Sequence, residues 1–132
     1  MQNLSSFTPA QRDACLPVVD LMLECSEVAR TEGVLALEKW QGKQESKFLR
    51  FIVMLVVDGV DPDLVLSMGR TLIESSGHEG AALLERMMLL EGLSSVQWGE
   101  HPHILEQKLL CMLGEAYLTR RGTFMVQSGK IY

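Results

Sequence analysis

Asp58-Gly59-Val60-Asp61-Pro62-Asp63 stands between two apolar segments and marks where one element ends and the next begins. An Asp-Gly pair is typical of an element's end, whereas Asp61 before Pro62 is typical of an N-cap followed by proline in the first helical turn. The acid after the proline favours the same assignment, because the N-terminus of a helix carries partial positive charge. The stretch therefore predicts a helix from Pro62 to about Ser75, broken by Gly77.

The segment before this turn, Lys47 to Val57, is apolar on every side, with Arg50 as its one interior charge. Such a segment is either a buried helix or a buried strand. Its β-branched residues keep the strand alternative open, because periodicity alone does not separate the two for a short apolar run. As a helix, the segment would be the second of the chain, central and buried.

A long first helix is predicted ahead of that segment. Thr8 and Pro9 form an N-cap and first-turn pair, and apolar residues then recur at three- and four-residue steps as far as a helix end near Gly42. Gly33 falls on this apolar stripe, where a glycine costs about 1 kcal/mol relative to alanine. We therefore expect Gly33 to permit close approach of another helix.

Two further helices are predicted after Gly77, one from residue 78 or 79 to residue 98 and one over residues 102–121. The first of them carries a weak echo of the long helix, because Glu-Gly precedes an apolar stretch and a tryptophan in both. The echo predicts similar packing roles for Gly33 and Gly92, with chance similarity as the alternative.

About five helices in a chain of 132 residues indicate a single compact all-α domain. Hydrophobic residues make up 47% of the chain, which is ample for one packed core. Residues 122–132 show no helical period, and we expect this tail to be mobile or to pair with a partner.

The charge balance and the apolar runs exclude several classes of partner. Seventeen acidic residues against twelve basic ones give a net charge of −5, without a basic block that would attract nucleic acid or anionic lipid. The longest apolar run, Phe51 to Val57, has seven residues, whereas a transmembrane helix needs about twenty. The N-terminus lacks the pattern of a signal peptide. We expect a soluble cytoplasmic protein without membrane insertion.

No residue set stands out as catalytic or metal-binding. Three cysteines are widely spaced, and we expect them to be reduced thiols: Cys15, Cys25 and Cys111. His101 and His103 with His78 invite a metal site, but no cysteine or acidic motif completes a ligand set, and Glu100-His101 is better explained as the start of the last helix. A nucleophilic Cys25 paired with His78 is an alternative that the position of Cys25 on the apolar stripe disfavours.

Three carboxylates gather around the central turn, at Asp58, Asp61 and Asp63. They could attract a hard cation, but capping and turn formation account for them, and the spacing is not that of an EF-hand loop. We therefore expect no metal, no cofactor and no enzymatic activity.

Four short motifs follow one another along the chain. They are Ala29-Arg30-Thr31-Glu32-Gly33, Leu35-Ala36-Leu37-Glu38, Val57-Asp58-Gly59 and Asp61-Pro62. Together with their surroundings from Val18 to Ala82, they resemble the first large cytoplasmic segment of the MotA family, the ion-driven stators of the bacterial flagellar motor. Residues 86–96 and 101–110 resemble the family's second cytoplasmic segment. The resemblance implies that residues 18–115 join both cytoplasmic segments directly, with all four membrane helices absent.

In that family, the cytoplasmic segment presents charged residues to the rotor switch protein. Carried over by motif position, the partner-binding pair is Arg30 and Glu38. On one helix, these residues would lie about 12 Å apart along the axis and about 80° apart around it. The alternative is that each is a solvated charge on an amphipathic helix. The remaining motif residues are expected to be structural: Gly33, Asp58, Gly59, Asp61, Pro62 and Gly92.

The function implied by the resemblance is that of a non-enzymatic protein-interaction module. It would bind or modulate a component of the flagellar motor, with the rotor switch protein as the first candidate, without transporting ions. The alternative function is that of a helical adaptor or regulatory protein for a cytoplasmic partner outside the motor.

Overall fold

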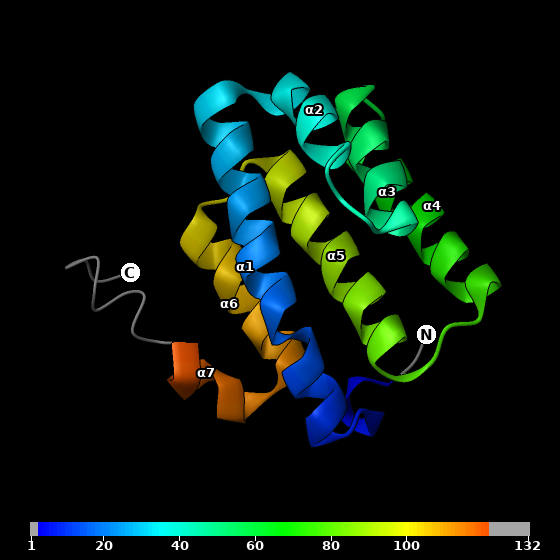
Figure 1. The fold of residues 1–132 in the computed structure, drawn as a ribbon, viewed down its shortest axis with the longest axis vertical. Helices are drawn as coiled ribbons and strands as arrows, with labels where there is room; N and C mark the ends of the chain where they lie inside the picture. The colour runs from blue at the N-terminus through cyan, green and yellow to red at the C-terminus, as the bar shows by residue number, and fades with distance from the viewer. Residues whose placement is uncertain (1–2, 122–132) are drawn as a thin grey trace.

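The computed structural model describes residues 3–121, and all regular elements in that range are helical (Figure 1). They are η1 (Leu4–Ser6), α1 (Pro9–Glu32), η2 (Val34–Ala36), α2 (Leu37–Gln41), α3 (Lys47–Val57), α4 (Pro62–Ser76), α5 (Gly80–Trp98), α6 (Pro102–Leu113) and α7 (Glu115–Arg121). The predicted all-α fold is confirmed for these residues, with seven α-helices where about five were expected. The predicted behaviour of residues 122–132 concerns a segment outside the described range.

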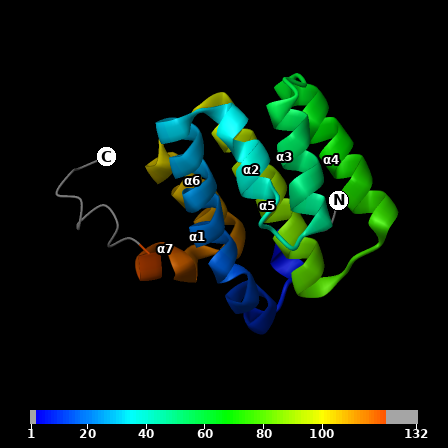
Figure 2. The same cartoon turned by 45° about the horizontal axis from the view of Figure 1, so that its top comes forward.

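Helix α5 lies at the centre of the molecule. It contacts α1 and α6 on one side and the α3–α4 hairpin on the other, as Figures 1 and 2 show. Its buried residues come from nearly every side of the helix, which is the pattern of a helix surrounded by others. These residues are Leu83, Leu84, Met87, Met88, Leu89, Leu90, Gly92, Leu93, Ser94, Ser95 and Val96.

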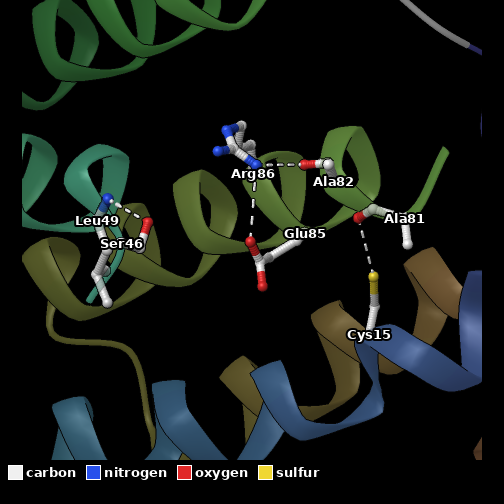
Figure 3. Close-up of polar contacts among 7 residues, drawn as sticks. All are labelled: Cys15, Ser46, Leu49, Ala81, Ala82, Glu85 and Arg86. Carbon is white, nitrogen blue, oxygen red and sulfur yellow. Dashed lines mark hydrogen bonds and ion pairs between the residues drawn. The ribbon is translucent and has the colours of Figure 1, made fainter. Parts of the chain in front are cut away.

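The prediction that Lys47 to Val57 is the central buried element is therefore wrong, although its helical alternative is confirmed. Ser46 caps α3 by accepting a hydrogen bond from the backbone N–H of Leu49, at 3.1 Å (Figure 3). Only one face of α3 is buried, and Phe51 on another face is 41% exposed. Helix α3 thus carries more apolar side chains than the core buries.

The turn from Asp58 to Asp61 forms as its sequence predicts. Gly59 N–H donates to the Val56 carbonyl and Val60 N–H donates to the Leu55 carbonyl, which is the Schellman arrangement of a helix C-terminus. The Asp61 carboxylate then accepts a hydrogen bond from the Asp63 backbone N–H, at 2.9 Å, and Pro62 occupies the first turn of α4. Of the three acids around this turn, Asp61 caps α4 with its side chain.

Gly92 has the close-packing role that the sequence predicts. A Cβ atom built at Gly92 would lie 2.5 Å from Cγ of Met22 on α1. No side chain larger than hydrogen fits without moving Met22, which is fully buried. Gly92 therefore sets how closely α1 and α5 approach each other.

Gly33 does not share that role, and the predicted continuous helix from Pro9 to Gly42 is wrong. Gly33 has φ +92° and ends α1, with its N–H donating to the Ala29 carbonyl. A Cβ atom at this position would meet nothing within 4 Å, so no helix packs closely against it. The backbone conformation rather than the packing requires glycine here.

The last predicted helix, over residues 102–121, is also divided. Gly114, with φ +111°, separates α6 from α7. The Arg12 guanidinium binds at this break, donating from Nη1 to the Leu113 carbonyl at 3.2 Å and from Nε to the Phe7 carbonyl at 3.1 Å. Arg12 thus links the start of α1 to the end of α6 and supplies donors for carbonyls that a helix end leaves unpaired.

Candidate functional site

The predicted partner-binding residues lie on either side of the break at Gly33. Arg30 is in the last turn of α1, and Glu38 is in the first turn of α2. The expectation that they share one helix, with the spacing of one helix, is therefore wrong. They nevertheless belong to one short segment, and we call residues 30–38, which join α1 through η2 to α2, the α1–α2 corner.

The middle of the α1–α2 corner is apolar and exposed. Leu35 is 73% exposed, the largest value for a large apolar side chain in the part of the chain that the structure describes. Val34 beside it is 37% exposed. Exposed leucines are common singly, but here two apolar residues stand between an exposed arginine and an exposed glutamate. Sequence reasoning did not include Leu35 among the site residues, although a continuous helix would also place it on the side opposite the apolar stripe that contains Gly33 and Leu37.

The corner is anchored to the core by the residues that follow it. Leu37 is fully buried, and Trp40 is 6% exposed. The Trp40 Nε1–H donates a hydrogen bond to Oε1 of Glu24 on α1, at 2.8 Å, which ties α2 back to α1. Contacts of α2 with α1 and α3 add to this fixation. Leu35 is therefore presented on a held turn, and a held turn loses less entropy on binding than a mobile one.

The side chains of Arg30 and Glu38 are exposed and available to a partner, and Glu32 between them in the sequence is also exposed. Within residues 3–121, neither the Arg30 guanidinium nor the Glu38 carboxylate forms a hydrogen bond or an ion pair. Each sign suits its local helix, because a cation is favoured at the C-terminus of α1 and an anion at the N-terminus of α2. The helix dipoles alone could therefore explain why an arginine stands at position 30 and a glutamate at position 38.

The other predicted motif residues have the local roles described above and do not gather at the corner. Asp58, Gly59, Asp61 and Pro62 form the turn between α3 and α4, and Gly92 lies inside α5. Of these motif residues only Gly33 lies in the corner, where it ends α1 between Arg30 and Glu38.

Two of the three cysteines, Cys15 and Cys25, are buried. Burial, with a smaller contribution from the charge of Glu24, raises the pKa of Cys25 to about 12. Burial and then the charge of Glu85 raise the pKa of Cys15 to about 11, and its thiol donates to the Ala81 carbonyl at 3.3 Å (Figure 3). A thiolate is the reactive form, so both thiols are inert near neutral pH. Cys111 is exposed.

His101 caps the N-terminus of α6. His101 Nδ1 accepts a hydrogen bond from the His103 backbone N–H, at 3.0 Å, at the N-terminus of α6. Just before it, Glu100 accepts from Lys108 and from Ser95, both at 2.7 Å, and these bonds lower the pKa of the Glu100 carboxyl. Among residues 3–121, no group of three or more histidines, cysteines or acids could hold a metal ion.

None of the helices in residues 3–121 is both long and apolar enough to cross a membrane. The chain matches no protein-family model, no curated protein and no solved structure. The resemblance to the MotA family therefore stays a prediction from the sequence.

Proposed function

We propose that this chain is a protein-interaction module that binds a component of the flagellar rotor switch through the α1–α2 corner. In this role it modulates the motor without conducting ions. The proposal is supported by the MotA-like words at residues 29–38 and, above all, by the exposure of Leu35 on an anchored turn. An apolar centre with charges at its rim is the usual anatomy of a protein interface.

Arg30 and Glu38 supply the orientation of the complex in this proposal. Opposite charges on the two sides of Leu35 match a partner surface that carries an acid and a base in the reverse order. Such complementarity steers the encounter and disfavours wrong registers, while burial of Leu35 contributes apolar contact. Leu35 would thus supply the apolar contact, and the two charges would fix the orientation of the bound partner.

Exchanging the two charges, R30E with E38R, should weaken binding to the purified rotor switch protein by about tenfold or more, because both partner charges then meet their own sign. Leu35→Ser should weaken it by a similar factor through lost apolar contact. Biolayer interferometry or titration calorimetry measures both effects.

The matched control is R70E with E74R, which reverses an exposed arginine and an exposed glutamate on α4 and also leaves the net charge unchanged. Binding of this control should equal that of the original chain. If the R30E/E38R variant keeps its circular dichroism spectrum and binds with unchanged affinity, the partner does not bind through the charged residues of the α1–α2 corner.

A further inference from the structure

A shallow trough runs along the α3–α4 hairpin. Its middle part is a hollow of about 410 Å³, and the residues that line it are Phe51, Ser67, Met68, Thr71, Leu72 and Ser75. Phe51 is 41% exposed although it belongs to the most apolar helix of the described chain. Leu64, one turn before Met68 on the same stripe of α4, is 51% exposed and continues the apolar surface.

The trough becomes cationic at one end. A second hollow, also of about 410 Å³, shares Phe51 and Leu72 with the first, so the two form one continuous surface. Lys47, His78 and Arg86 line this second hollow. Neither hollow is lined by an acidic residue within residues 3–121, in a chain whose net charge is −5. The sign of this end is therefore opposite to that of the chain as a whole.

Arg86 keeps donors for a ligand at that end. Its Nη1 donates to the Ala82 carbonyl at 2.9 Å and lies 3.7 Å from Oε1 of Glu85, and Figure 3 shows the other end of the guanidinium turned away from both partners. The contact with Glu85 is long and partly exposed, so it holds the arginine weakly. Lys47, in the first turn of α3, is exposed.

We propose that this trough binds an amphipathic α-helix of a partner protein, with apolar side chains over Phe51, Met68 and Leu72 and an acidic residue against Lys47 and Arg86. A groove between two helices offers ridges at the i and i+4 positions, as with Met68 and Leu72, and a third helix packs its own ridges into them. The cations fix the direction of the bound helix, because only one end of the trough accepts an acid. The trough is separate from the α1–α2 corner, so its test is independent of the proposed function.

The test uses the full chain and two fluorescent synthetic helices of about 18 residues. Both carry leucines on one face, and one ends in a pair of glutamates where the other has lysines. We expect the glutamate peptide to bind about tenfold more tightly than the lysine peptide in fluorescence anisotropy. Lys47→Glu should reduce this preference at least severalfold, and the effect should fade at high salt.

Phe51→Asp should weaken the glutamate peptide by about tenfold or more, because it places a charge in the apolar part of the trough. The matched control is Ile104→Asp on α6, where the isoleucine is 45% exposed, and this variant should bind as the original chain does.

Three results would overturn the proposal. One is equal affinity for the two peptides, and another is unchanged affinity in the Phe51→Asp variant. The third is self-association of the chain that Phe51→Asp abolishes, measured by sedimentation velocity, because a second copy would then be the occupant.

Discussion

Replacing Leu93 by alanine should lower the free energy of unfolding by about 2–5 kcal/mol. Leu93 is fully buried in α5, the helix that contacts α1, α3, α4 and α6. Truncation removes apolar contacts and leaves a cavity among helices whose positions are set by several neighbours, so little relaxation can fill it. Urea denaturation of the full chain, followed by circular dichroism, measures the change as a lower midpoint at an unchanged slope.

Leu64→Ala is the matched control for that substitution. It removes the same atoms from a leucine that is 51% exposed on α4 and should change the stability by no more than about 0.5 kcal/mol. Equal losses in the two variants would contradict the assignment of α5 as the centre of the core.

Replacing Gly92 by leucine should lower the stability by about 1–3 kcal/mol, through overpacking rather than a cavity. The new side chain would enter the space of Met22, whose Cγ and Sδ lie 2.5 and 2.7 Å from the position of the added Cβ. Because Met22 is fully buried, it cannot turn out to solvent to make room. The thermal and urea midpoints of the variant both report the loss.

A double-mutant cycle of Gly92→Leu with Met22→Ala tests the mechanism of this loss. The second substitution empties the space that the introduced leucine side chain needs, so the two penalties should add to more than the loss measured in the double variant. Gly42→Ala is the control, because its φ of −62° suits alanine and its nearest neighbour is 3.4 Å away. Strict additivity in the cycle would show that the side chain introduced at Gly92 and that of Met22 do not compete for the same space.

The sequence predicts the helix boundaries best where a capping residue or a proline marks them. Asp61 and Pro62 start α4 as expected, and Gly77 and Gly99 follow the ends of α4 and α5. These signals are local, since the cap residue bonds to a backbone group only a few positions away. They need no knowledge of how the helices pack.

The two glycines of the internal echo show where local reasoning stops. Gly33 and Gly92 both follow a glutamate and precede an apolar stretch, yet Gly33 breaks a helix in open space and Gly92 packs against Met22. A glycine in an apolar stripe is compatible with either role, because both the interior and the C-cap of a helix accept it. Contacts between elements distant in the sequence decide between them.

Local sequence also does not predict which helix is central or how the candidate site is shaped. Lys47 to Val57 is more uniformly apolar than α5, but Phe51 faces outward and α5 fills the centre with leucines, methionines and small residues. At the corner, the sequence indicates Arg30 and Glu38 but not Leu35, and it does not indicate the break at Gly33 that places the two charged residues on different helices. The sequence thus predicted the charged residues of the candidate site, but neither its exposed apolar centre nor the helix break within it.

The most direct test of the proposed function is a comparison of what two forms of the full chain capture from a whole-cell extract of the source organism. One bait is the original chain, and the other carries R30E, L35S and E38R together, with quantification by mass spectrometry. We predict that a rotor switch component is enriched by the original chain and reduced by about tenfold or more with the triple variant. Capture of the same proteins in the same amounts by both baits would contradict the account. If the original chain instead captures a protein from outside the motor, and the triple variant does not, the rotor assignment is contradicted and the adaptor function is favoured.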